Sequence, residues 1–447
     1  MHNGIGVTML RNKSGSRPLS RRNHVTSAIA VGAAAVLALS ACGAGGPNTS
    51  SSSGAKNLTV LVEAGGHGEL QPIADAYKKQ TGTKITFVEL PYDGLYNRLT
   101  SEFSSGTVSF DVAALDAIWL PAFKDAVTPL NAMFTDDVKK DLFPSLVQGA
   151  QIGGTYVGMP AWANTEILFY RTDLFNDPTQ KANFKSQYRY DLVPPTTWQQ
   201  YTDVAKFFTQ PATGLYGTSV KGAVETEWLA NLSQAGEKNM VIDSNGKSTL
   251  GDKASLDALN FYTSQIPSSP AGAAQVDWAA AQNLFNQGKT AIMLFWAHAY
   301  TQIPADSPVS GKVGVAPMIG GSAGVAGVPG PWYLSVAKAS PNQKASLDFL
   351  KFAYEHNALA VTSSLGLAAR ISAFEKYQDD PKYAAFKPLI ATLNAPATIS
   401  RPANAKWQQI VDSVLVPMLQ KAVVPGANNQ QLLNDAATKV NAITQSQ

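Results

Sequence analysis

Several tryptophans stand at or just beyond the ends of expected strands and helices, and the sequence places polar side chains close to four of them. The tryptophans are Trp119, Trp162, Trp228, Trp296 and Trp332, and the polar neighbours are Asp116, Asn164, Glu225 and His298. A flat ring stacks on the C–H face of a sugar, and carboxylates and amides bind its hydroxyl groups. These residue types together therefore favour carbohydrate binding.

Trp296 shows the alternative that each of these rings leaves open. It ends the alternating stretch AIMLFW, which follows an apolar helix end and the sequence Asn286-Gln287-Gly288. A tryptophan at the end of a strand often only covers the hydrophobic core. We interpret Trp296 as a ring that stacks on a ligand, with core packing as the alternative.

No motif of a catalytic or nucleotide-binding site appears in the chain. It contains no G-x-S-x-G elbow, no H-E-x-x-H pair, no P-loop and no G-x-G-x-x-G after an expected strand. The single cysteine, Cys42, allows neither an internal disulfide nor a cysteine metal site. We therefore expect no catalytic residue, no metal and no cofactor. Two carboxylates that face each other across a cleft, as in glycosidases, stay an alternative.

Residues 1–41 predict the signal peptide of a bacterial lipoprotein. Five basic residues and no acidic one accompany the apolar run 25–39, which is shorter than the roughly 20 residues that span a bilayer. The run leads into Leu39-Ser40-Ala41-Cys42, which resembles a lipobox. We expect cleavage before Cys42 and a lipid on its thiol. The pair Arg21-Arg22 leaves export by the twin-arginine route open.

Removal of this segment changes the sign of the net charge. The full chain has 35 Lys and Arg against 32 Asp and Glu; the signal takes five basic residues with it, so 30 face 32, a net charge of −2. The mature chain therefore lacks the basic excess typical of a nucleic-acid-binding protein. Residues 43–55, GAGGPNTSSSSGA, read as a Gly/Ser linker that spans roughly 20 Å as a random coil.

The body of the chain alternates strands and helices. These are expected in turn at residues 57–64, 68–82, 84–90, 92–103 and 110–115. Such a succession is typical of an α/β fold with mostly parallel sheets, and a chain of this length usually forms two domains. Further on, Thr197 and Gln200 predict a capped helix through Phe208, and Asn245-Gly246 predicts a hairpin turn.

Six segments, in order along nearly the whole mature chain, carry a resemblance to a known family. They include TYVGMPAWANTEILFYRTDLF, AAQNLFNQGKTAIMLFW and PWYLSVAKASPNQKASLDFLKF, and they span residues 66–123, 155–175, 195–208, 239–250, 280–296 and 331–352. Their order resembles the family 1 extracellular solute-binding proteins, the carbohydrate receptors of ABC importers typified by maltose-binding protein.

The resemblance implies a two-lobed periplasmic-binding-protein fold, type II-like, with the ligand cleft between the lobes. Each lobe would be a mostly parallel sheet flanked by helices. The N-terminal lobe would hold residues 56–161 and 328–367, and the C-terminal lobe residues 162–327 and 368–447. The chain would cross between the lobes near residues 162–164, 320–330 and 368–370, where small residues suit a hinge.

The resemblance and the tryptophan pattern together select the candidate ligand-binding residues. Glu63 has the alternative role of capping a helix, and Arg370 that of pairing with a carboxylate of a lobe. The full set is Glu63, His67, Tyr92, Asp116, Trp119, Trp162, Asn164, Glu225, Trp228, Trp296, Trp332 and Arg370. Three tryptophans are left out: Trp198 as a core contact, Trp278 as part of a polar loop, and Trp407 as the start of a helix.

The resemblance also implies what the protein does and where. It would be a non-catalytic receptor that closes on a sugar, either a monosaccharide or a longer one, and delivers it to the permease subunits of an ABC importer. It would be a monomer outside the cytoplasm, held at the membrane by the lipid on Cys42. Two alternatives stay open: a receptor of the same fold for a polyamine or a glycerophosphodiester, and an extracellular carbohydrate-active enzyme.

Overall fold

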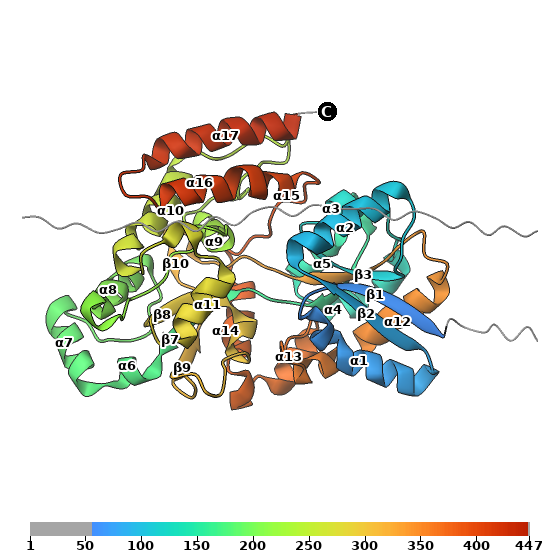
Figure 1. Cartoon of the computed structure of the whole chain (residues 1–447), viewed down its shortest axis with the longest axis horizontal. Helices are drawn as coiled ribbons and strands as arrows, with labels where there is room; N and C mark the ends of the chain where they lie inside the picture. Colours follow the sequence, from blue (N-terminus) through green and yellow to red (C-terminus); the bar gives the residue numbers. More distant parts are fainter. Residues whose placement is uncertain (1–55, 446–447) are drawn as a thin grey trace, which may run out of the picture. The chain divides into compact units, whose positions relative to one another are not determined.

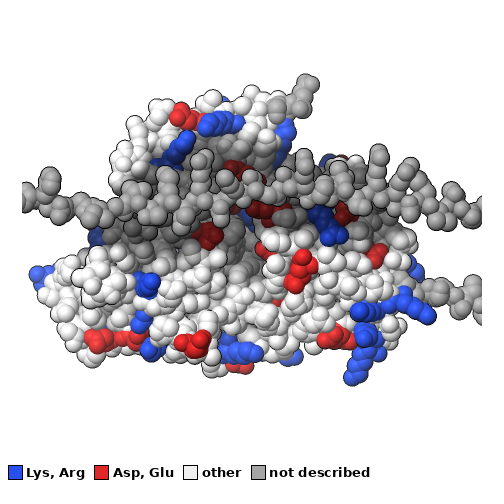
Figure 2. Space-filling model, viewed as in Figure 1, with Lys and Arg blue, Asp and Glu red and all other residues white. Residues whose placement is uncertain are grey.

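The computed structural model describes residues 56–445, which form two larger β-sheets surrounded by helices, and two short β-ribbons (Figure 1). Within this range, no helix has both the length and the apolar character needed to cross a membrane. On the face drawn in Figure 2, Lys and Arg are scattered among Asp and Glu across a surface that is mostly uncharged. The predicted signal peptide, Cys42 and the linker lie outside the described residues.

The first sheet joins strands from distant parts of the sequence, in the order β2-β1-β3-β12-β6. The strands are β1 (Asn57–Glu63), β2 (Lys84–Leu90), β3 (Val112–Asp116), β6 (Met159–Trp162) and β12 (Trp332–Val336). The central strands β3 and β12 are buried along their whole length and are almost entirely apolar, as expected of strands covered on both faces.

The second sheet has the order β8-β7-β9, with β7 (Glu166–Arg171), β8 (Ile292–Trp296) and β9 (Val313–Ala316). Beyond β8, the segment Tyr216-Gly217 runs parallel to the start of that strand, and Ala291 and Ile292 donate backbone hydrogen bonds to its carbonyls. The expected alternation of β8 is less clear than the sequence suggests, because Ala291 to Phe295 are all buried.

The sequence predicted mostly parallel sheets, but only part of the first sheet is parallel. β1 pairs in parallel with β2 and β3, as the strand and helix succession predicts. β12, however, runs antiparallel to both β3 and β6, and β7 runs antiparallel to β8 and β9. The reason is that β12 and β8 join their sheets after long excursions of the chain, so the local succession of elements does not determine their direction.

Helices cover both faces of the first sheet (Figure 1). α1 (Gly66–Thr81) lies beside α12 (Gln343–Glu355), and the ring of Tyr77 meets Phe349 and Phe352 edge-on at 5.2 and 5.0 Å between centroids. α2 (Tyr92–Ser105) packs on β1 and β2. The shorter elements near this sheet are α3 (Leu120–Phe123), α4 (Asp136–Lys140), α5 (Pro144–Ala150), β4 (Gln151–Ile152), β5 (Thr155–Tyr156) and α13 (Ile371–Tyr377).

The second sheet is covered by helices from the middle and the end of the chain. They are α6 (Thr172–Asn176), α7 (Pro178–Tyr188), α8 (Trp198–Phe208), α9 (Thr226–Gln234), α10 (Lys253–Ser264), α11 (Trp278–Asn286) and α14 (Phe386–Leu393). The C-terminal helices α15 (Trp407–Ile410), α16 (Val416–Ala422) and α17 (Asn429–Gln445) all contact a π-helical turn, and α17 packs on α10 (Figure 1).

Two local signals of the sequence are confirmed. The hydroxyl of Thr197 caps α8 by accepting a hydrogen bond from the backbone of Gln200, whose side chain accepts one from the backbone of Thr196. The hairpin turns at Gly246, which has a positive φ of 76°, and is closed by a bridge between Ile242 and Ser248.

Backbone hydrogen bonds join the three segments in which crossings between the lobes are expected. Ala163 donates to the carbonyl of Ala368 at 2.7 Å, and Gly330 donates to the carbonyl of Asn164 at 2.9 Å. The ribbon of β10 (Gly320–Gly321) and β11 (Gly324–Val325) lies within the second of these segments, 320–330. The three segments are therefore side by side, whereas the lobe boundaries themselves stay a prediction.

We predict that Gly217→Ala destabilises the protein strongly. A methyl group at this position would lie only 1.9 Å from the backbone oxygen of Ala205, near the end of α8, and a backbone atom gives way at a high cost. Loss of about 3 kcal/mol in the free energy of unfolding is expected, measured by chemical denaturation. Gly94→Ala is the matched control, because its methyl group would make contacts no closer than 3.8 Å inside α2. Equal stability of both variants would contradict this packing.

Candidate ligand-binding site

Four aromatic residues of the predicted set meet at one edge of the first sheet. The ring of Trp119 lies 4.6 Å from that of Tyr92 and 5.5 Å from that of Trp332, and Trp332 stacks on Trp162 at 5.7 Å. β3 ends at this edge, β6 ends there, and β12 begins there, since it runs in the opposite direction. This edge is where ligands bind in open α/β sheets. We call these four residues the aromatic cluster.

A buried ion pair lies beside the aromatic cluster. Asp116, the last residue of β3, accepts a hydrogen bond of 2.9 Å from Nη2 of Arg401 and another of 2.9 Å from the hydroxyl of Tyr92. The side chains of Asp116 and Arg401 are only 9% and 5% exposed. Nε1 of Trp119 donates to Oε1 of Gln408 at 2.9 Å. The segment 401–408, which leads into the C-terminal helices, is thus bonded directly to the edge of the first sheet.

Two more predicted carboxylates, Glu63 and Glu225, belong to the same electrostatic environment. Burial, and then the negative charge of Asp116, raise the pKa of Glu63 to about 7. Burial also raises the pKa of Glu225, although the positive charge of Arg401 acts against this shift. Glu63 ends β1, and Glu225 directly precedes α9. The site therefore contains more acidic than basic side chains, and Arg401 is the cation that offsets them.

Asn164 occupies the junction between the crossing segments. Its Nδ2 donates to Nδ1 of His298 at 2.8 Å, and its backbone oxygen accepts from Gly330. Burial lowers the pKa of His298 to about 4, so that the ring is neutral at neutral pH and its Nδ1 is able to accept. Asn164 is thereby held by both neighbours, and its role in ligand binding stays a prediction.

Trp296 lies apart from the aromatic cluster. It ends β8 and is half-buried, and two atoms of its ring come within 2.6 and 2.7 Å of the position that a side-chain carbon at Gly330 would take. The ring therefore packs directly on Gly330, on the segment that leads to β12. Its predicted contact with a ligand stays a prediction.

Three further members of the predicted set lie outside the cluster. Nδ1 of His67 pairs with Glu89 at 2.6 Å, and the side chain is 45% exposed. Arg370 pairs with Asp141 at 2.6 Å and lies over the ring of Tyr354, which is the alternative that the sequence left open for it. Trp228 is completely buried in α9. The aromatic cluster and Asp116 lie at the ends of β3, β6 and β12, whereas Trp296 ends β8 and Glu225 precedes α9.

Sequence reasoning missed Arg401 and Gln408. Arg401 lies in an irregular segment before α15 and has no motif around it, and its partner Asp116 is 285 positions away in the sequence. Trp278 is also placed differently from the expectation, because it begins α11 and donates to the hydroxyl of Thr226 at 3.4 Å. Trp407 begins α15 as expected and is fully buried.

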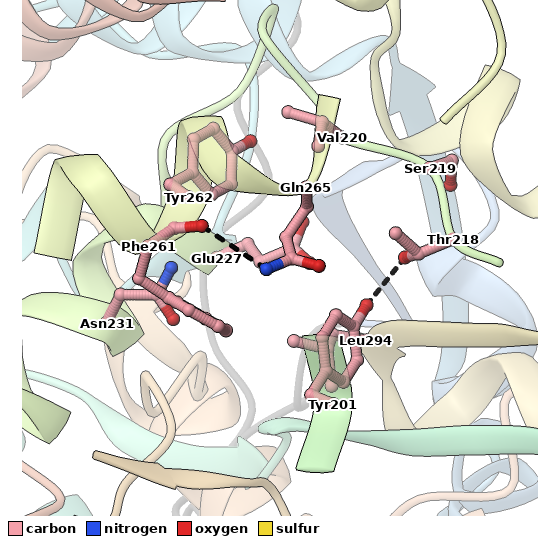
Figure 3. Close-up of a pocket in the computed structure, with 10 residues that line it drawn as sticks. All are labelled: Tyr201, Thr218, Ser219, Val220, Glu227, Asn231, Phe261, Tyr262, Gln265 and Leu294. Atoms are coloured by element: carbon pink, nitrogen blue, oxygen red, sulfur yellow. Dashed lines mark hydrogen bonds between the residues drawn. The ribbon is translucent and has the colours of Figure 1, made fainter. Parts of the chain in front are cut away.

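A second buried polar cluster lies under the second sheet. Nζ of Lys221 is 2.5 Å from Oε2 of Glu227 and donates to the carbonyl of Leu294, while the hydroxyl of Thr226 donates to Glu166 at 2.8 Å. Figure 3 shows a small cavity beside this cluster, between α8, α9 and α10. None of the predicted ligand-binding residues lines this cavity, so it is separate from the candidate site.

The family model described as bacterial extracellular solute-binding protein matches residues 63–359, and the chain belongs to this family. A probable ABC transporter-binding protein of Deinococcus radiodurans is 27% identical over 402 residues, covering 83% of this chain and 91% of the relative. A maltooligosaccharide ABC transporter solute-binding lipoprotein of Streptococcus pneumoniae is 26% identical over 342 residues, covering 71% and 73%.

Solved structures show the fold. A solute-binding protein of an Agrobacterium radiobacter ABC transporter, in complex with ribitol, has a TM-score of 0.71 at 24% identity, and the match covers 87% of this chain and 99% of that one. The two-lobed α/β fold predicted from the sequence is thereby confirmed, with the correction to strand direction described above.

We predict that Glu166 makes the stability of the protein depend on pH. Burial, and then the charge of Glu227, raise the pKa of Glu166 from the ordinary value of 4.5 to about 8. The folded protein therefore favours the protonated carboxyl, and this stabilisation is lost as the pH rises from about 4.5 through about 8. Glu166→Gln keeps an acceptor for Thr226 and removes the titration. Its melting temperature should rise relative to that of the wild type as the pH increases across this range.

Glu102→Gln is the control for this experiment. Partial burial raises the pKa of Glu102, but hydrogen bonds from Arg98 and Ser109 outweigh it and lower the pKa below the ordinary value. This carboxylate loses its stabilising contribution only as the pH falls below about 4.5. A constant difference in melting temperature between wild type and Glu166→Gln at all pH values would contradict the prediction.

Proposed function

We propose that this protein is a receptor of an ABC importer, which binds a neutral sugar or polyol between two lobes and delivers it to the permease. The single observation that supports this most is the aromatic cluster beside the Asp116–Arg401 pair. Stacked rings next to fixed donors and acceptors suit a ligand with apolar C–H faces and many hydroxyl groups. The relatives named above, which carry a maltooligosaccharide description and a bound ribitol, support the same ligand class.

We assign the N-terminal lobe to residues 56–161 and 328–367 and the C-terminal lobe to 162–327 and 368–447. In this assignment Asp116 and Trp119 belong to one lobe, and Arg401 and Gln408 to the other, so their hydrogen bonds join the lobes. When the two lobes open, these four side chains separate and become exposed to water. A ligand shifts the protein toward closure by the difference in its affinity for the two states.

We assign each candidate residue a role in ligand binding from the chemistry of its side chain. Tyr92, Trp119, Trp162 and Trp332 provide stacking faces, with Trp296 and Trp228 on the opposite lobe. Glu63, Asp116, Glu225 and Asn164 accept or donate hydrogen bonds to hydroxyl groups, while His67 and Arg370 would act at the margin. We propose no catalytic step. Asp116 accepts hydrogen bonds from Arg401 and Tyr92, which suits it to orient these side chains for binding.

We also propose that the mature protein is a monomer outside the cytoplasm, attached to the membrane by a lipid on Cys42. The family is extracellular, and one relative is described as a lipoprotein. Delivery then takes place beside the permease, because the linker 43–55 limits how far the receptor moves from the membrane.

A thermal-shift screen of the full-length protein tests the ligand class. Neutral sugars and polyols, spermidine and glycerophosphocholine are compared, and at least one neutral carbohydrate should raise the melting temperature, since a ligand at a hundredfold excess over its Kd stabilises by about 2.7 kcal/mol. The bound carbohydrate should be recovered chemically unchanged. A shift with spermidine or glycerophosphocholine alone favours the non-sugar receptor, and turnover of the carbohydrate favours the enzyme.

We predict that Trp296→Ala weakens the binding of the carbohydrate found in this screen by about thirtyfold or more, which is the effect of losing a stacked aromatic ring worth about 2–4 kcal/mol. Isothermal titration calorimetry measures the Kd. Trp198→Ala is the matched control, because Trp198 is also half-buried but stacks on Phe261 at 4.4 Å in the helical layer. Unchanged affinity with a large loss of melting temperature would assign Trp296 to the core.

Replacement of the predicted lipid attachment site tests the anchor. We expect Cys42→Ala to leave the protein uncleaved or to release it from membranes, because without the thiol no lipid is attached. Cell fractionation, with the mass of the protein in each fraction, is the measurement. A variant of mature length that still sediments with membranes would refute the lipid anchor.

A further inference from the structure

A small pocket lies beside Arg401, and none of the four residues of the aromatic cluster is among its walls. Its walls come from α5 and β4, from the segment 329–331, from the start of β12 and from the segment 400–403. In the lobe assignment proposed above, the last of these belongs to one lobe and the remaining walls to the other. The pocket therefore continues the candidate site rather than forming a separate one.

Two residues that line this pocket each have a buried polar atom without a partner among the described residues. Nε of Arg401 and Oγ of Ser145 are both buried, and neither makes a hydrogen bond within residues 56–445. The hydroxyl of Tyr333, another wall residue, is occupied, since it donates to the carbonyl of Leu146 at 3.0 Å. Because a buried guanidinium N–H without an acceptor is costly, the arrangement indicates that an acceptor is supplied from outside the chain.

The charges around Arg401 decide which acceptor fits. Nη2 of Arg401 is already paired with Asp116, and Glu63 and Glu225 are two further carboxyl groups of the same site, whose pKa burial raises. An anionic group in the pocket would meet a guanidinium that is already paired and would lie close to the carboxylate of Asp116. A neutral oxygen that both accepts and donates, such as a hydroxyl group, satisfies Nε of Arg401 and Oγ of Ser145 without this repulsion.

We propose that this pocket is a ligand subsite, in which Nε of Arg401 and Oγ of Ser145 bind a terminal hydroxyl group of a neutral sugar or polyol. The subsite makes Arg401 and Ser145 specificity-determining residues that reject ligands with a carboxylate at the same end. This inference rests on the proposed function, because it concerns the same carbohydrate.

Calorimetry with matched ligand pairs tests the selectivity of the subsite. Ribitol is compared with ribonate, mannitol with mannonate, and maltitol with maltobionate, so that each pair differs only by a terminal CH2OH or carboxylate. Full-length wild-type protein should bind at least one of the neutral members, at least tenfold more tightly than its acid. Equal or tighter binding of the acid overturns the proposal.

Ser145→Ala tests the hydrogen bond itself. The hydroxyl has no partner in the protein, so its removal should leave the melting temperature of the ligand-free protein unchanged, while affinity for the preferred neutral member falls about three- to tenfold. The matched control is Ser346→Ala, because the hydroxyl of Ser346 in α12 is likewise buried and unpaired but lies outside the pocket. It should change neither quantity.

The possible failures are distinguishable. If Ser145→Ala binds the neutral ligand as tightly as the wild type, the pocket holds water and the subsite is refuted while the proposed function stands. If none of the three neutral members binds but another carbohydrate raises the melting temperature in the wider screen, the subsite is again refuted alone. If no carbohydrate binds at all, the proposed function fails together with the inference.

Discussion

The buried ion pair between Asp116 and Arg401 is the interaction on which the candidate site depends. A carboxylate at the end of a buried central strand is tolerated only with a charged or hydrogen-bonded partner, and Arg401 and Tyr92 supply both. The pair fixes Asp116 at the edge of the first sheet and brings residues 401–408 against it. The hydrogen bond between Trp119 and Gln408 and the pocket beside Arg401 both lie next to that contact.

The strand directions explain why the site forms at this edge. β3 ends where β12 begins, so Asp116 and Trp332 are direct neighbours in the sheet, and Trp162 pairs with Trp332 on its other side. A purely parallel sheet would have carried Trp332 to the opposite edge. The antiparallel entry of β12, which the sequence did not predict, is thus what assembles the aromatic cluster.

The strands and helices of residues 57–116, the cap at Thr197 and the turn at Gly246 were predictable because each depends on neighbours in the sequence. Trp162 and Trp332 do lie at the ends of strands, as the sequence suggested. Arg401 and the Lys221–Glu227 pair were not predictable, since a buried charge is identified only by a partner that the fold brings to it. Hydrophobic periodicity in the sequence shows which face of a helix or strand is buried, but it does not show which charged residues will pair in the fold.

The contact between Trp296 and Gly330 couples two positions that are otherwise independent. The indole ring occupies the space that any side chain at position 330 would need, and Gly330 belongs to one of the segments that lie side by side between the sheets. A larger residue at 330 is therefore compatible only with a smaller one at 296. For protein engineering, this means that a library that varies position 330 alone would sample mostly damaged molecules, whereas a library that also allows smaller residues at position 296 would not.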